Sequence, residues 1–149
     1  MELVNEITAH LENKPGRLAK ICSSLAQEKV DLQAICVMET TGGASVLRLV
    51  ASDVEAARRI LTSLGTESTL AEVLAVQVDN HTGALAGVLE KLAAEHINIE
   101  YAYISSSAGQ GKALVILHTT NLKRAQQILL RDSAPAAERS GGRRPLHSR

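Results

Sequence analysis

The sequence predicts an α+β protein made of two tandem βαββαβ units, each with an antiparallel sheet covered by helices on one face. Two observations support this fold class. A segment that begins at Asn13 recurs 67 residues later at Asn80, so the chain contains an internal repeat. Within each copy, segments with strand-like alternation are interleaved with segments that place apolar residues three or four apart, as helices do.

The repeat extends through most of the chain. Residues 13–19 align with residues 80–86, and residues 30–32 align with residues 97–99. One inserted residue near Gly111 raises the offset to 68, after which residues 57–61 align with 125–129. A register this long through helices and connections indicates a duplicated structural unit.

The first half of each copy reads as a strand followed by a helix. Residues 6–11 alternate polar and apolar side chains, which predicts a strand with one buried face. The Pro15-Gly16 pair ends this strand and starts a helix, because proline is tolerated in the first helical turn. Leu18, Ile21 and Leu25 then share one face of that helix.

The second half of each copy reads as a hairpin and a second helix. Strands are expected over residues 31–39 and 44–50, on either side of the Thr41-Gly42-Gly43 turn. The following helix opens at Ser52 or Asp53, and Ser52 has the sequence context of a capping box. Each copy therefore has the order of a ferredoxin-like fold.

Residues 67–78 must supply both the last strand of the first copy and the first strand of the second. We assign residues 1–71 to unit 1 and residues 72–131 to unit 2. Residues 132–149 lack alternation and are rich in Arg, Gly, Pro and Ser, which predicts a disordered tail. The second unit consequently lacks a clear last strand.

The sheet face opposite the helices carries apolar residues in both copies. Val46 and Arg48 lie on it in the first copy, and Leu114, Ile116 and His118 lie on it in the second. An apolar face left in water is costly. We expect this face to be buried against the sister unit or against a second chain.

Composition excludes several classes of protein. The chain of 149 residues has 16 basic and 16 acidic residues, so it lacks the positive electrostatic potential that attracts a nucleic-acid backbone. With two tyrosines and no tryptophan or phenylalanine, it also lacks the aromatic side chains on which bases stack. No signal peptide or long apolar run is visible, and the two cysteines form no disulfide framework, so we expect a cytoplasmic protein without membrane association.

No pattern for a cofactor, a metal or catalysis is visible. The five histidines are scattered, and neither a Walker loop nor a nucleophile elbow occurs. We therefore expect no enzyme activity, no cofactor and no metal site.

The segment Asn13-Lys14-Pro15-Gly16 after a strand, the Leu-striped helix and Val30-Asp31-Leu32 resemble the ACT domain. This domain is a small-molecule-binding regulatory module attached to many enzymes of amino-acid biosynthesis. The whole chain resembles stand-alone proteins with two tandem ACT domains, over residues 3–130. The resemblance implies that an amino-acid effector lies at an interface between two units.

The resemblance also implies which residues meet the effector: the loop between first strand and first helix, and a polar residue at the start of the second strand. Carried over, these are Asn13, Pro15, Gly16, Arg17, Leu18 and Asp31 in unit 1, and Asn80, Gly83, Ala84, Leu85 and Asn98 in unit 2.

The chemistry of these residue types agrees with that assignment. A helix N-terminus favours the α-carboxylate, glycine permits close approach, and Asn or Asp oxygens accept from the α-ammonium. Unit 2 departs from the pattern with Thr82 in place of Pro15, and unit 1 departs with Asp31 where Asn is common. Which unit binds, or whether both do, stays open.

Each of these assignments has a structural alternative. The asparagine and glycine loops could simply cap helices, and Asp31 and Asn98 could simply start strands. Tyr101 and Tyr103 share one strand face, and we favour interface packing with a polar tip over stacking on an effector.

The sequence thus predicts an amino-acid-binding regulatory protein that passes its signal to a partner. We expect a homodimer. The alternative is a non-catalytic dimerising or regulatory subunit of an amino-acid biosynthetic enzyme such as acetolactate synthase, without its own effector.

Overall fold

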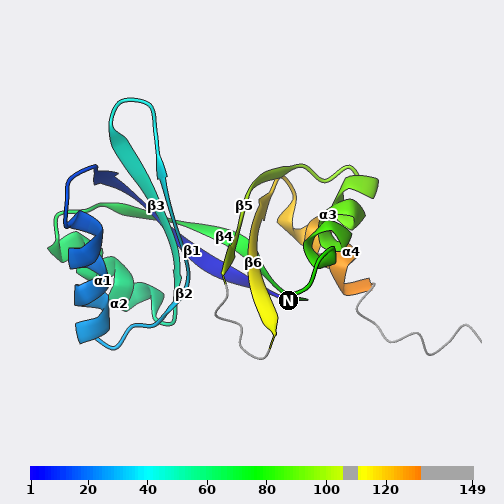
Figure 1. Cartoon of the computed structure of the whole chain (residues 1–149), viewed down its shortest axis with the longest axis horizontal. Helices are drawn as coiled ribbons and strands as arrows, with labels where there is room; N and C mark the ends of the chain where they lie inside the picture. Colours follow the sequence, from blue (N-terminus) through cyan, green and yellow to red (C-terminus); the bar gives the residue numbers. More distant parts are fainter. Residues whose placement is uncertain (106–110, 132–149) are drawn as a thin grey trace, which may run out of the picture.

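A six-stranded antiparallel sheet runs through both halves of the chain, in the strand order β2-β3-β1-β4-β6-β5 (Figure 1). The structure is a computed structural model, and it describes residues 1–105 and 111–131. The elements follow the predicted order: β1 (Glu2–Glu12), α1 (Arg17–Gln27), β2 (Leu32–Glu39), β3 (Ala44–Ala51), α2 (Val54–Ser63), β4 (Ser68–Asp79), α3 (Ala84–Ala94), β5 (Ile99–Ser105), β6 (Lys112–Thr119) and α4 (Leu122–Arg131).

Strand β4 belongs to both units, as predicted. Its residues 68–72 pair with β1 of the first unit, and its residues 74–79 pair with β6 of the second. The expected unit boundary between residues 71 and 72 falls inside this continuous strand. The two units are therefore joined by a shared strand rather than by a linker.

The place of the last strand of the second unit is filled by the beginning of the chain. Glu2, Leu3 and Val4 pair with residues 73–75 of β4, on the side of β4 opposite β6. The Leu3 side chain packs against the core of the second unit. Helix α4 ends at Arg131, and the predicted tail (132–149) lies outside the described residues.

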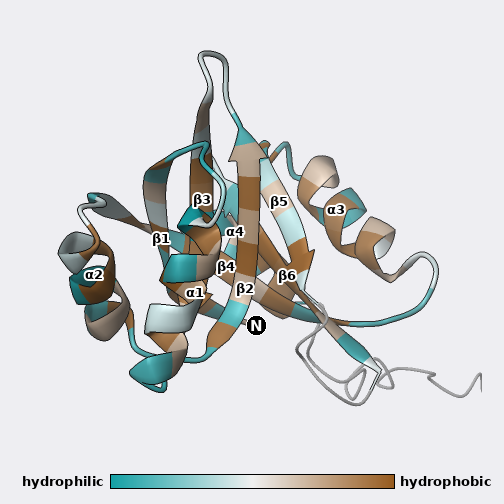
Figure 2. Ribbon diagram, turned by 60° about the vertical axis from the view of Figure 1, so that its left-hand side comes forward, coloured by the Kyte–Doolittle hydropathy of each residue, from teal (hydrophilic) through white to brown (hydrophobic). Residues whose placement is uncertain are grey.

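The two helix pairs cover the same face of the sheet. In β1, Ile7, Ala9 and Leu11 point to α1 and α2, while Leu3, on the same face of the strand, points to α3 and α4. The alternation that predicted half-buried strands therefore builds two separate cores, one under each helix pair. Figure 2 shows apolar residues along these strands.

The opposite face of the sheet curls onto itself, so that the edge strands β2 and β5 approach one another (Figure 1). A third buried cluster fills this space: Ala34, Val50, Val73, Ala75 and Ile116, with Val4, Tyr101, Tyr103 and Leu114 packed against it. Of the two expectations for the helix-free face, burial against the sister unit is the one the fold realises. We call this contact the seam.

Helix α2 begins at the second of the two predicted positions. The Asp53 carboxylate caps it by accepting from the Ala56 N–H at 2.9 Å. Ser52 caps no helix, because its hydroxyl accepts from the Asp31 N–H at 2.9 Å. This bond links the end of β3 to the start of β2.

Candidate functional site

Helices α1 and α3 begin in the same unusual way. Each follows a glycine in the left-handed region, with φ of 83° at Gly16 and 91° at Gly83, and no side chain caps either helix. A side chain at such φ values is strained, which accounts for glycine at both positions. The alternative that Asn13 and Asn80 cap these helices is therefore not what the structure shows.

The uncapped first turns of α1 and α3 determine what kind of group the two loops can bind. The amide groups at the start of an α-helix have no partner inside the helix, and the helix dipole adds partial positive charge there. Nothing lies within 4 Å of the position that a Cβ would take at Gly16 or Gly83. The first N–H of each helix bonds within its loop, Arg17 to the Lys14 carbonyl oxygen and Ala84 to the His81 carbonyl oxygen, so the N–H groups that follow them are the ones offered to an anionic group.

The predicted unit 1 loop residues lie together at the start of α1. Asn13 and Pro15 are exposed, and Leu18 is 37% exposed. Arg17 turns away, because its guanidinium donates to the Leu64 carbonyl oxygen and to Thr66 Oγ1, both at 3.1 Å. That side chain fastens the start of α1 to the end of α2.

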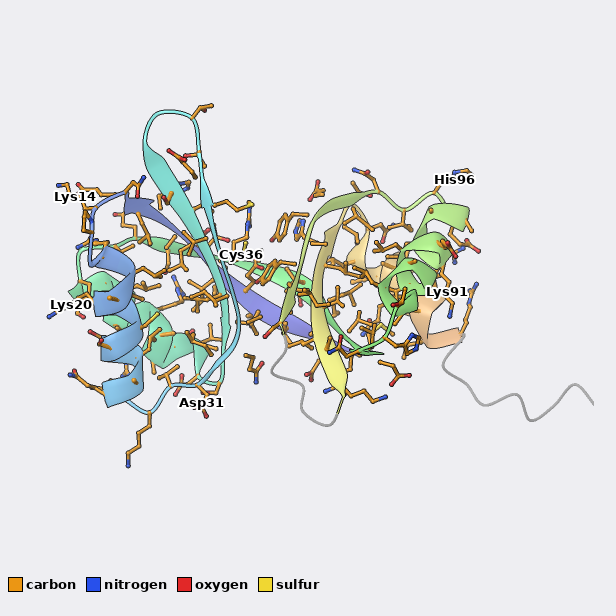
Figure 3. All side chains as sticks on the ribbon, in the orientation of Figure 1. Lys14, Lys20, Asp31, Cys36, Lys91 and His96 are labelled. Carbon is orange, nitrogen blue, oxygen red and sulfur yellow. The ribbon has the colours of Figure 1, made fainter. Side chains whose placement is uncertain are left out.

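Asp31 lies at the other end of the same helix, as Figure 3 shows by its distance from Lys14. The 11 residues of α1 separate the two ends by roughly 16 Å, at 1.5 Å per residue. The backbone of Asp31 is engaged with Ser52, whereas its side chain is exposed. One unit alone does not bring Asp31 and the Gly16 loop together.

The predicted unit 2 residues follow the same plan. Asn80 donates its backbone N–H to the Gly111 carbonyl oxygen at 2.8 Å, and Leu85, next to Ala84 in the first turn of α3, is 37% exposed. Asn98 accepts from the Thr120 N–H at 3.1 Å. Because α3 separates Gly83 from Asn98, these two also lie at opposite ends of a helix.

The helix pairs of the two units lie on opposite sides of the molecule. In Figure 3 Lys14 and Asp31 mark the two ends of α1 on one side, and His96 lies on the other side.

Two clefts contain one predicted residue each, Asn13 and Asp31. One of about 500 Å³ lies between the end of β1 and the β2–β3 hairpin, and it is lined by His10, Leu11, Glu12, Asn13, Lys14, Gly42, Gly43 and Ala44. One of about 530 Å³ lies beside the end of α1, and it is lined by Cys22, Leu25, Ala26, Lys29, Val30, Asp31 and Leu32. Neither cleft includes a residue of unit 2.

Sequence reasoning missed a polar cluster at the seam, centred on Glu6. The Glu6 side chain is fully buried, although strand alternation had placed it on the polar side of β1. Its two carboxylate oxygens accept from the Tyr101 and Tyr103 hydroxyls, each at 2.6 Å. Arg48 donates to Glu6 at 3.3 Å and to Thr8 Oγ1 at 3.3 Å.

Stacked rings extend this cluster across β5 and β6. The Arg48 guanidinium carbon lies 3.8 Å from the Tyr101 ring centroid, and the His118 ring stacks on Tyr101 with centroids 4.9 Å apart. His118 Nδ1 lies 2.5 Å from a Glu100 carboxylate oxygen. The expectation that the tyrosines pack at an interface with polar tips is confirmed.

Burial in the seam, the larger cause, and the hydrogen bond to the Glu6 carboxylate, the second, raise the pKa of both tyrosine hydroxyls above the usual 10. Both phenols therefore stay protonated and act as donors over the physiological pH range.

The remaining chemistry of the described residues is limited. Over residues 1–105 and 111–131, no group of three or more His, Cys, Asp or Glu side chains could hold a metal ion. The two cysteines, Cys22 and Cys36, are unpaired thiols and half-buried. Within the same residues, no helix is long and apolar enough to span a bilayer.

Comparisons with known proteins agree with the duplicated fold. Residues 2–138 match the family model of the ACT domain pair. Protein BT0572 from Bacteroides thetaiotaomicron superposes with a TM-score of 0.79 at 30% identity, over 88% of this chain and 89% of that one.

Two regulatory subunits of aspartate kinase share the fold. The ligand-free form from Thermus thermophilus has a TM-score of 0.64 at 16% identity, over 87% of this chain and 94% of that one. The subunit from Thermus flavus has a TM-score of 0.56 at 17% identity, over 87% and 93%. A search of curated proteins finds no match. The family model spans nearly all described residues, and the chain therefore belongs to the ACT domain pair family, whose domains are regulatory.

Proposed function

We propose that this chain is a cytoplasmic, non-catalytic regulatory protein that binds an amino acid at an interface between ACT units. The observation that carries the proposal is the pair of uncapped, glycine-led helix starts at Gly16 and Gly83. Each presents free amides suited to an α-carboxylate. The polar residues that would take the α-ammonium are Asp31 and Asn98, which directly precede β2 and β5.

The proposed contacts are those of the two loops and the two strand starts. They comprise Asn13, Pro15, Gly16, Leu18 and Asp31 in unit 1, and Asn80, Gly83, Ala84, Leu85 and Asn98 in unit 2. Arg17 is the exception among the predicted residues, because its guanidinium is engaged by Leu64 and Thr66. Its backbone N–H also has a partner, the Lys14 carbonyl oxygen at 3.3 Å, so Arg17 leaves the proposal.

We propose a homodimer as the working form. The edge strands of the sheet carry exposed apolar side chains: Ile35, Val37 and Met38 on β2, and Ile104 on β5. β2 lies between α1 and α3 in Figure 2 with much of its surface apolar. A second copy would cover these side chains and extend the sheet from an edge strand.

A thermal-shift screen of the twenty amino acids tests the proposal. A ligand at 100 times its dissociation constant stabilises the folded state by about 2.7 kcal/mol, so a true effector raises the melting temperature at millimolar concentration. If none of the twenty does so, the effector is not an amino acid and the proposal fails.

Matched glycine variants identify the unit that binds. Gly16→Ala and Gly83→Ala place a methyl group beside the free amides of one loop at a time. Gly65→Ala imposes similar backbone strain at φ of 73° outside both loops, and it is the control. Loss of the thermal shift in one loop variant, with the shift kept in the control, assigns the site to that loop.

A regulatory protein without catalytic activity acts through a partner protein. Because ACT domains are attached to enzymes of amino-acid biosynthesis, we propose such an enzyme as the partner. Co-purification of a catalytic subunit that responds to the effector would support a sensor. Co-purification without any amino-acid effect would instead favour a dimerising subunit without an effector.

A further inference from the structure

The seam consists of two halves built at equivalent positions of the repeat. Thr8 pairs with Arg48 between β1 and β3, and Ala75 pairs with Ile116 between β4 and β6. In the same way, Ala34 pairs with Val50, and Tyr101 pairs with His118. The offset of 67 or 68 residues therefore relates one half of the seam to the other. The equivalent pairs are Glu6 and Val73, Thr8 and Ala75, Arg48 and Ile116, Ala34 and Tyr101, Cys36 and Tyr103, and Val50 and His118.

One half is apolar and fully enclosed. Its residues are Ala34 and Val50 from unit 1, with Val73, Ala75 and Ile116 from unit 2, and none is more than 3% exposed. No hydrogen-bonding side chain is needed to hold it together. Its separation would bring apolar surface into water with nothing gained in return.

The other half is polar and reaches solvent at its rim. Unit 1 contributes Glu6 and Arg48, and unit 2 contributes Tyr101, Tyr103 and His118. Glu6 is fully buried, but the Arg48 and His118 side chains are 20% and 25% exposed. Separation here exchanges each internal hydrogen bond for one to water, and it exposes the Tyr101 and Tyr103 rings where they pack against the apolar cluster.

We propose that the seam is a hinge between the two ACT units. The apolar half is its fixed side, and Glu6 with the two tyrosines bonded to it, Tyr101 and Tyr103, is the latch on its opening side. With Glu6 bound to both tyrosines, the units are closed. When these bonds break, unit 2 rotates away about Ala34, Val50, Val73, Ala75 and Ile116, and the Tyr101 ring enters solvent. Hinged closure of this kind needs one side that stays packed and one that parts reversibly.

The latch lies between segments that lead to the loop of one unit and the strand start of the other. Strand β1 continues from Glu6 toward Asn13, and Tyr101 stands in β5 three residues after Asn98. Rotation about the apolar half would therefore shift Asn98 relative to the Asn13 loop. The hinge itself rests on the contacts of the seam and does not require an effector.

The composition of the chain supplies a selective probe for each half. Both tyrosines lie in the latch and the chain has no tryptophan, so its intrinsic fluorescence reports on the polar half alone. For the apolar half, Ala34→Cys in a background of Cys22→Ser and Cys36→Ser places one thiol at a position that is 2% exposed.

The test compares Glu6→Gln with its parent in that background. Quenching of tyrosine fluorescence by acrylamide measures access to the latch, and the rate of modification by a thiol reagent measures access to position 34. The glutamine offers one acceptor oxygen instead of two, so the open population should rise roughly tenfold or more from the minor fraction typical of such equilibria. The thiol should stay as protected as in the parent.

Two results would overturn the hinge. Unchanged quenching would mean that Glu6 does not hold the latch. A parallel rise in thiol reactivity would mean that the seam opens as one cooperative body.

Should Glu6→Gln fail to fold, Tyr103→Phe removes a single hydroxyl, and the fluorescence of Tyr101 then reports the opening. Ile116→Val is the reciprocal variant, expected to expose the thiol before the tyrosines.

Discussion

Helices α1 and α3 occupy equivalent places in the two units, yet they are held there by different means. Helix α1 buries Ile21 and Leu25 and is also tied to the end of α2 by Arg17. Helix α3 buries only Leu92 fully, and Ala84 stands where Arg17 would be. The same glycine loop can therefore precede a helix that is held by many contacts or by few, and α1 is held more firmly than α3.

The largest difference is expected from the equivalent core leucines Leu25 and Leu92. Either Leu→Ala change leaves a cavity and should cost about 2–5 kcal/mol of unfolding free energy. Leu92→Ala should lie at the upper end of that range, because α3 has no second fully buried residue. Urea unfolding of both variants measures this, and equal losses would refute the difference between the helices.

Alkaline pH should weaken the seam more than either helix pair. The folded-state pKa of Tyr101 and Tyr103 is raised above the unfolded value, so their contribution is complete below about pH 10 and is lost as pH rises beyond it. Unfolding free energies measured from pH 8 to 11 should fall at the alkaline end. The double variant Tyr101→Phe with Tyr103→Phe should fall less steeply.

A smaller effect is expected from the Arg17 tie. Arg17→Met keeps the apolar stem and removes two hydrogen bonds, which should cost about 1–2 kcal/mol. The matched change Ala84→Met in unit 2 should stay within about 0.5 kcal/mol of the parent. Similar losses in both variants would show that the guanidinium does not fasten α1.

The smallest effect concerns the second helix of each unit, where the two copies agree. Asp53 caps α2 and Asn121 caps α4, each by accepting an N–H three residues ahead at 2.9 and 3.0 Å. Asp53→Ala and Asn121→Ala should each cost about 1 kcal/mol. Thermal unfolding of the two variants should give near-equal shifts, unlike the pair at α1 and α3.

Local patterns were sufficient to predict the elements, the repeat and the double use of β4. Periodicity fixed which face of each strand meets its helices, since that contact is within one unit. The same alternation assigned Glu6 to the polar face of β1, and its burial depends on a contact with β5, nearly a hundred residues away along the chain. The repeat held a clue, because it aligns Glu6 with Val73, a residue typical of a core.

The candidate site was predicted as a set of residues, and the structure places the loop and the strand start of each unit at opposite ends of a helix. The helix predicted between Gly16 and Asp31 already implies this separation. The strand that completes unit 2 could not be predicted, since three residues of β1 carry no local sign of the partner that they pair with.

The placement of Glu2–Val4 in the second unit has a consequence for how the polypeptide can be divided. Cutting between the repeats would leave the later fragment with an open edge beside β4 and a gap where Leu3 belongs. During synthesis Glu2–Val4 emerge before β4, so they acquire their final neighbours only after β4 has followed. A synthetic peptide with the sequence of β1 should therefore complement the isolated later fragment, as donated strands do in other sheets.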